Sequence, residues 1–125
     1  MKKKLREFGI MLNYIKLVRN TMPEFTHVKI VKKANVYFDG KVTSRTIKFE
    51  DGTMKTLGFM QVGEFTFNTQ HAEIMEIYTG ELEVFLPDVK EPICIKGEGV
   101  FEVPADSKFT VHVKVPVDYC CSFIK

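Results

Sequence analysis

The sequence is poor in cysteine, proline and glycine, and it lacks any long run of apolar residues. No stretch approaches the roughly 18–20 apolar residues that span a bilayer, so we expect no integral membrane protein. Three cysteines are an odd number, and the adjacent Cys120 and Cys121 would face opposite sides of a strand. This pattern predicts reduced thiols in a cytoplasmic protein rather than a disulfide framework. Five prolines and eight glycines exclude a collagen-like or low-complexity chain.

A strong excess of positive charge is also absent, since the net charge is only +2. Residues 1–25 hold six basic and two acidic side chains, whereas the rest holds 12 basic and 14 acidic ones. A nucleic-acid-binding domain normally carries its positive charge on the folded body, so we expect no binding to nucleic acid. A hydrophobic content of 45% over 125 residues suffices for one packed domain.

Residues 1–25 form a basic N-terminal extension that we separate from a domain at 26–125. Apolar residues at three- and four-residue spacing predict a short helix or a flexible tail there (Leu5, Phe8, Met11, Ile15 and Val18). The polar interruptions and the lack of a small-residue cleavage site argue against a signal peptide. The basic face would suit a membrane surface or an anion, and a simple surface helix or tail is the alternative.

From residue 26 onward the hydrophobic period changes to two, and turn signals recur about every ten residues. Asp39-Gly40 and the segment 50–52 predict hairpin turns. Thr79-Gly80 predicts a turn between strands 74–78 and 82–86, and two further strands are expected at 109–115 and 119–124. Many short strands with no helical pattern between them predict an all-β closed barrel or two-sheet sandwich.

Alternation along these strands assigns an apolar interior (Phe65, Phe67, Leu82, Val84, Leu86, Phe101, Val103, Phe109, Val111, Val113 and Val115). Ile74 and Phe85 are left pointing outward in this scheme. Glu76 and Tyr78 also fall outside, on the face opposite to Glu73. The resulting second apolar surface predicts a homodimer.

The segments 63–80 and 97–109 resemble those of a cupin, a small jelly-roll barrel. Metal-binding cupins place three histidines and one glutamate in these segments, and here only Glu73 stands at such a position, while Phe67, Thr69 and Phe109 occupy the others. One carboxylate without imidazoles cannot hold a transition metal firmly, so we expect no metal and no cofactor. A metal-dependent oxygenase that recruited other ligands is the alternative.

Several segments are similar to the small pyrimidine/purine nucleoside phosphorylase family, namely 33–45, 49–58, 73–80, 101–105 and 117–121. The resemblance covers roughly residues 26–125. It implies a metal-free cupin that cleaves diverse nucleosides with inorganic phosphate, releasing free base and ribose 1-phosphate. It implies nucleosides and phosphate as binding partners.

Phosphorolysis needs donors for phosphate, which cations and hydroxyl groups supply. Lys41, Ser44, Arg45 and Lys55 lie on two neighbouring predicted hairpins and are the candidates. Lys41 and Arg45 are expected on one face, and Ser44 on the other. Each could equally be an ordinary solvent-facing strand residue.

Glu73 is the predicted catalytic residue, beside Thr69 and facing the barrel mouth. A buried carboxylate needs donors, which ribose hydroxyls provide, and it could stabilise positive charge at the anomeric carbon. A structural carboxylate bound to backbone amides is the alternative. Tyr37 and Tyr119 could stack on bases of either kind, unless they are core residues. The competing function is a non-catalytic cupin that binds a small metabolite or dimerises as a scaffold.

Overall fold

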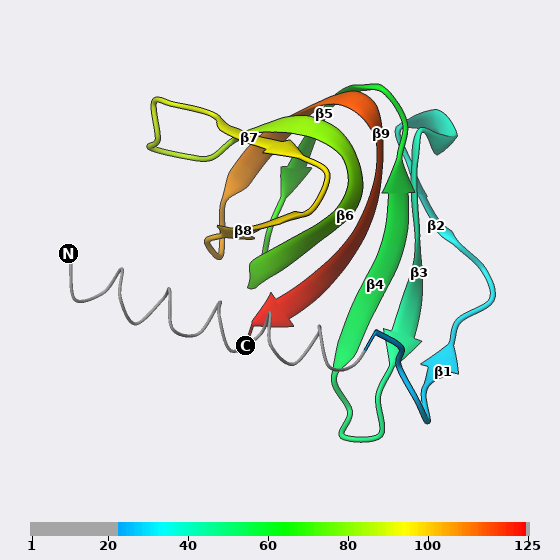
Figure 1. Ribbon diagram of the computed structural model, residues 1–125. Coiled ribbons are helices and arrows are strands. Elements are labelled where there is room, and N and C mark those ends of the chain that lie inside the picture. The colour runs from blue at the N-terminus through cyan, green and yellow to red at the C-terminus, as the bar shows by residue number, and fades with distance from the viewer. Residues whose placement is uncertain (1–22, 125) are drawn as a thin grey trace.

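The computed structural model describes residues 23–124, so the predicted helix or tail at 1–25 lies almost wholly outside the described residues. The described chain consists of strands and one short 3₁₀ turn (Figure 1). The elements are β1 (Lys29–Ile30), β2 (Asn35–Tyr37), η1 (Phe38–Gly40), β3 (Val42–Lys48), β4 (Met54–Met60), β5 (Gly63–Asn68), β6 (Ala72–Phe85), β7 (Ile93–Lys96), β8 (Gly99–Val103) and β9 (Lys108–Ile124). The predicted all-β class is confirmed. No helix among residues 23–124 is both long and apolar enough to cross a membrane.

The strands form one strongly bent antiparallel sheet rather than a closed ring of strands. Its main path runs β1-β3-β4-β9-β6-β7, and β2, β5 and β8 pair with β3, β9 and β6 respectively. Figure 1 shows β6 and β9 curving together around the interior, with β5, β7 and β8 on one side and β3 and β4 on the other. The strand pairs among residues 23–124 do not close the sheet into the barrel that we expected.

Two turn predictions are confirmed and two strand boundaries are wrong. Asp39 and Gly40 have positive φ values of 56° and 89° in the turn between β2 and β3. The β3–β4 hairpin closes around Gly52. By contrast, β6 runs unbroken through Gly80, and β9 continues through Pro116, where separate strands were expected. Register shifts in the β6–β9 ladder near residue 80 absorb the extra backbone there.

The alternation of apolar residues correctly places most of the interior. Among the buried core side chains are Phe65, Leu82, Val84, Phe101, Val103, Phe109, Val111 and Val113, against which Phe67 and Leu86 pack. Val115 was expected inside but is 49% exposed, because the pairing changes register just before Pro116. Ile74 was expected outside but is only 3% exposed, and Glu76 is equally buried. Phe85 lies outward as expected, at 41% exposure.

At Gly80 the backbone of β6 lies close against the backbone of β9. Its φ is +106°, which L side chains rarely adopt. A Cβ at this position would fall on the backbone carbonyl of Pro116 and lie 2.9 Å from the Cα of Val117. The bend of β6 against β9 therefore depends on a residue without a side chain.

We predict that Gly80→Ala lowers the free energy of unfolding by about 2–5 kcal/mol, because backbone strain and overpacking add. Gly97→Ala is the matched control, since Gly97 has φ +80° but no atom lies within 4 Å of the place that a Cβ would take. It should cost only the strain, about 1–2 kcal/mol. Urea unfolding of both variants measures the difference, and equal losses would contradict the close approach at Gly80.

Candidate functional site

A cavity of about 180 Å³ opens at one end of the concave face of the sheet. It is lined by side chains from β2, β3, β4, β5, β6 and β9, namely Tyr37, Ser44, Thr56, Met60, Phe67, Asn68, Glu73, Met75, Phe109, Tyr119, Cys121 and Phe123. Phe67 and Phe109 stack in its wall with ring centroids 5.3 Å apart. Glu73 is the one carboxyl group among these lining residues. The cavity therefore combines an apolar wall, several neutral donors and one acidic side chain.

A row of paired residues crosses the floor of the cavity. Ser44 pairs with Gly58, and Gly58 pairs with Tyr119. A Cβ on Gly58 would clash with the Tyr119 hydroxyl and ring, so the tyrosine lies across the glycine. Its hydroxyl lies beside Ser44, whose Oγ accepts from Asn35 Nδ2 at 3.1 Å. The absence of a side chain at position 58 thus lets residues of three strands meet.

Glu73 lies near the start of β6 and faces the cavity, as its expected position at the mouth requires. Its Oε1 accepts a hydrogen bond from Cys121 Sγ at 3.5 Å. Burial raises the pKa of Glu73 above its usual range, and the bond from Cys121 opposes that rise. The carboxyl is half-buried, and no backbone amide of residues 23–124 donates to it, so its alternative role as an amide-bound structural group gains no support.

The two predicted stacking residues differ in exposure. Tyr37 is 47% exposed, whereas Tyr119 is 5% exposed and belongs to the core cluster. Phe123, which the sequence did not single out, also lines the cavity and is 38% exposed. Burial raises the pKa of Tyr119, so its hydroxyl stays protonated and can donate a hydrogen bond. Aromatic surface is thus available at the rim, and a phenol donor at the floor.

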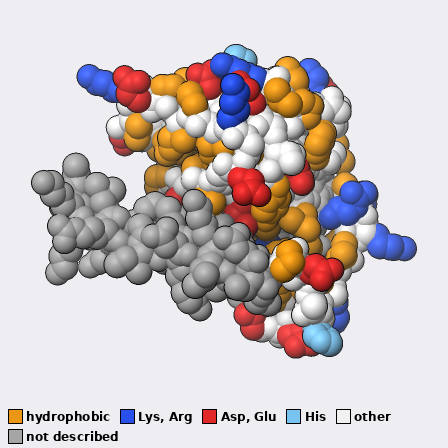
Figure 2. All heavy atoms as spheres, in the orientation of Figure 1, with side chains coloured by type: hydrophobic (Ala, Val, Ile, Leu, Met, Phe, Trp, Pro, Cys, Tyr) orange, Lys and Arg blue, Asp and Glu red, His pale blue; other side chains and the backbone are white. Residues whose placement is uncertain are grey.

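The three predicted cations do not line the cavity. Arg45 and Lys55 stand on the opposite face of β3 and β4: Arg45 Nε donates to the carbonyl of Lys32, and the Lys55 ammonium lies 5.7 Å from the ring centre of Phe25. Lys41 is exposed beside the turn η1. In Figure 2, hydrophobic and acidic side chains occupy the middle of the described surface, and Lys and Arg side chains stand mostly toward its edges. A phosphate-binding role for these three stays a prediction that the cavity lining does not support.

Thr69 is buried but does not line the cavity. Its Oγ1 donates to the carbonyl of Pro104 at 2.7 Å and accepts from the Ser107 amide at 3.0 Å. These bonds join the end of β5 to the turn before β9. Thr69 therefore fixes a loop near the site, and contact with substrate stays a prediction.

Sequence reasoning missed Asn35, Thr56, Asn68 and Cys121. Asn35 reaches Ser44 and, at 3.3 Å, the hydroxyl of Thr46. Thr56 and Cys121 are direct partners in the β4–β9 ladder. Only cross-strand register brings Thr56, Asn68 and Cys121 to the cavity and Asn35 to Ser44 behind it, and the chain gives no local signal for it.

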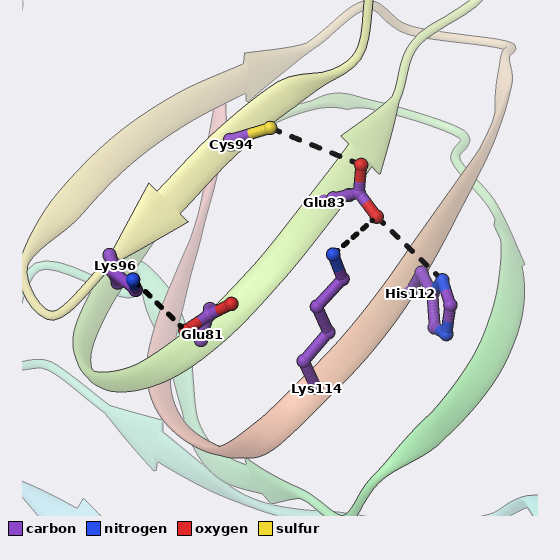
Figure 3. A network of polar contacts seen from close by, with 6 residues as sticks. All are labelled: Glu81, Glu83, Cys94, Lys96, His112 and Lys114. Atoms are coloured by element: carbon purple, nitrogen blue, oxygen red, sulfur yellow. Dashed lines mark hydrogen bonds and ion pairs between the residues drawn. The ribbon is translucent and has the colours of Figure 1, made fainter.

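A second polar cluster lies away from the cavity, on the outer surface of β6, β7 and β9 (Figure 3). Glu83 accepts from Lys114 Nζ at 3.1 Å and lies 3.8 Å from His112 Nδ1. Cys94 approaches the same carboxyl from β7. Within residues 23–124, no three histidine, cysteine or acidic side chains are grouped so as to hold a metal ion. The absence of a bound cofactor stays a prediction.

Residues 32–123 match the sequence profile of the family described as pyrimidine/purine nucleoside phosphorylase. A protein of that name from Citrifermentans bemidjiense is 56% identical over 103 residues, which are 82% of this chain and 100% of the relative. Another of that name from Syntrophotalea carbinolica is 53% identical over 104 residues, 83% of this chain and 100% of the relative.

Solved structures of similar proteins identify the fold. A protein of unknown function from Acinetobacter sp. ADP1 is 39% identical, with a TM-score of 0.78, covering 82% of this chain and 100% of that one. An RmlC-like cupin from Shewanella frigidimarina is 15% identical, with a TM-score of 0.61, covering 82% and 93%. The predicted cupin-like jelly roll is therefore confirmed.

We predict that Thr69→Val lowers the free energy of unfolding by about 1–3 kcal/mol, because the Ser107 amide loses its buried partner. Thr66→Val is the control: its hydroxyl pairs with that of Thr110 at 2.8 Å in an exposed position. This control should change stability by about 0.5 kcal/mol or less. Urea unfolding checks both, and a Thr69 variant of normal stability but weakened nucleoside binding would instead favour direct contact.

Proposed function

This chain belongs to the pyrimidine/purine nucleoside phosphorylase family, and we propose that it cleaves diverse purine and pyrimidine nucleosides with inorganic phosphate. The products are free base and ribose 1-phosphate. The observation that carries the proposal is a cavity with one inward carboxyl, Glu73, a ring of neutral hydrogen-bond donors, and exposed aromatic side chains at its rim.

The size of the cavity favours a site for sugar and phosphate with the base at the entrance. Its 180 Å³ is below the roughly 300–1,000 Å³ usual for sites that enclose a whole ligand. A base at the rim would stack on Tyr37 or Phe123, and every base offers a π-face. Hydrogen bonds to base edges are then not required for binding. Broad base tolerance follows from this arrangement.

In the proposed reaction a phosphate oxygen forms a bond to the anomeric carbon of ribose as the glycosidic bond breaks. The electron pair of that bond leaves with the base, which takes up the proton that hydrogen phosphate loses as it becomes the sugar phosphate. Positive charge develops on the sugar, and the Glu73 carboxylate stabilises it electrostatically and accepts hydrogen bonds from sugar hydroxyls.

Phosphate would be held mainly by neutral donors, because no lysine, arginine or histidine is among the described residues that line the cavity. Ser44, Thr56 and Tyr119 supply hydroxyl groups, and Asn68 supplies an amide. Asn35 donates to Ser44. The Ser44 and Tyr119 hydroxyls lie beside each other, so a hydrogen bond between them uses one of their two protons and leaves the other for a ligand.

Release of base should depend on phosphate. We expect the purified full chain to release free base from uridine, thymidine, adenosine and guanosine when phosphate is present, and to release none in a phosphate-free buffer. Chromatography of the free base and of ribose 1-phosphate checks the stoichiometry, which should be one to one. Binding of nucleosides without any turnover would support the non-catalytic metabolite-binding cupin instead.

Glu73→Gln should lower kcat/KM by about 10²–10³-fold, because it removes the charge that stabilises the transition state. Burial raises the pKa of Glu73, so the inactive protonated form persists above the ordinary value of 4.5. Wild-type activity should therefore fall as pH decreases through that raised value, and the Gln variant should lack this limb.

Glu64→Gln is the matched control for this prediction, since Glu64 is an exposed carboxylate on the neighbouring β5. It should retain wild-type kcat/KM and the acidic limb. Equal activity of the Glu73 and Glu64 variants would eliminate the proposed role of the buried carboxyl.

The homodimer, the cytoplasmic location and the boundary between residues 25 and 26 remain proposals that rest on the sequence. The family match begins at residue 32, and the matched relatives are about as long as the part of this chain they cover. Residues 1–25 would thus be an addition to the catalytic domain.

A further inference from the structure

We propose that Cys121 is a positioning residue whose thiol holds one oxygen of Glu73 and leaves the other free for substrate. The role of the substrate in this inference rests on the proposed function, whereas the contact between thiol and carboxyl does not. The proposed reaction by itself requires nothing of Cys121.

The contact is built by the pairing of β6 with β9. Met75 is the register partner of Cys121, and Glu73 is the partner of Phe123. Glu73 and Cys121 are therefore diagonal neighbours on the cavity face, within reach of each other's side chains. The thiol donates from Sγ to Oε1 over 3.5 Å. Both residues line the cavity, and Cys121 is only 5% exposed.

Within residues 23–124, the thiol is the one hydrogen-bond donor to Glu73. Among the described residues that line the cavity, the other titratable groups are the tyrosines Tyr119, from β9, and Tyr37, from β2. The cavity linings from β3, β4 and β5 consist of uncharged side chains. Without the thiol, no fixed donor from the described part of the chain would keep the carboxyl in one rotamer.

Thr56 extends the contact to a third strand. It is the register partner of Cys121 in the β4–β9 ladder, and its side chain lies beside the same thiol. Burial and the nearby carboxylate both raise the pKa of Cys121, so the sulfur keeps its proton and remains a donor. A thiol held in this form orients a carboxylate and does not act as a nucleophile.

The neighbouring Cys120 supplies a control within the same dipeptide. It is fully buried, but it belongs to the opposite face of β9, where it contacts Tyr78. Substituting Cys120 changes a buried thiol on the same strand without touching Glu73. A general disturbance of β9 would affect both positions, whereas a positioning role belongs to Cys121 alone.

The test compares the full-length wild type with C121V, C121S and C120V. The pKa of the Glu73 carboxyl is measured by NMR titration of protein labelled with ¹³C-glutamate, with the signal assigned from E73Q. Loss of a donor to the ionised form should raise this pKa by about one unit in C121V. C121S retains a donor and should stay near wild type, as should C120V.

Kinetics of the same variants give the second readout. In C121V the acidic limb of the pH–rate profile should move upward by the same amount, and kcat should fall about tenfold with KM nearly unchanged. An unchanged Glu73 pKa in C121V, or an equal shift in C120V, would overturn the inference even in an active enzyme. If no variant and no wild-type protein releases base, the proposed function fails, while the NMR titration still decides the contact. If C121V does not fold, a C121S variant with an altered Glu73 pKa would equally overturn the inference.

Discussion

The pairing of β6 with β9 is the constraint on which the rest of the structure depends. These two strands carry the longest ladder in the described chain, and every other part of the sheet attaches to them, directly or through β4 and β3. Because Gly80 allows the backbone of Pro116 to approach, the pair can bend without breaking. The bend gives the sheet a concave side, and the cavity lies on it. Loss of this one curvature would remove the site as well as the fold.

The electrostatics of the site follow from the lack of Lys, Arg and His side chains among the described residues that line the cavity. Glu73 is the single charged residue among the described lining, and desolvation acts on it without a cation to offset the penalty. Such a carboxyl is stabilised most by an environment that becomes positive, as a ribose does when it loses its base. In the proposed reaction the neutral hydroxyl groups of Ser44 and Tyr119 would bind phosphate without the cost of a buried counter-charge. The chemistry of the reaction and the shortage of fixed positive charge are therefore compatible.

The sequence predicted local features well and long-range ones poorly. Period-two alternation correctly separates Ser44 from Arg45, but it does not say which of the two faces is concave. Thr79-Gly80 is a typical turn sequence, yet in the structure Gly80 lies at a bulge within β6. The backbone of β9 there fills the space that a side chain would need. Pro116 gives the signal of a strand end and lies inside a strand. Cys121 has no sequence signal for its place beside the carboxyl, since that place depends on register between residues 48 positions apart.

Cys120 and Cys121 are adjacent on β9, a strand that forms part of the cavity wall. Cys121 lines the cavity and Cys120 lies buried on the opposite face of β9, so a single layer of backbone separates their side chains. Cys120 is itself fully buried, so the side chains that cover it lie one residue along the chain from the atoms that face the cavity. A small rotation of β9 would move the side chains on both of its faces together. No chain of side-chain contacts is needed to connect the two faces. Substitutions among the side chains that cover Cys120 would therefore alter the shape of the cavity without changing any residue that lines it.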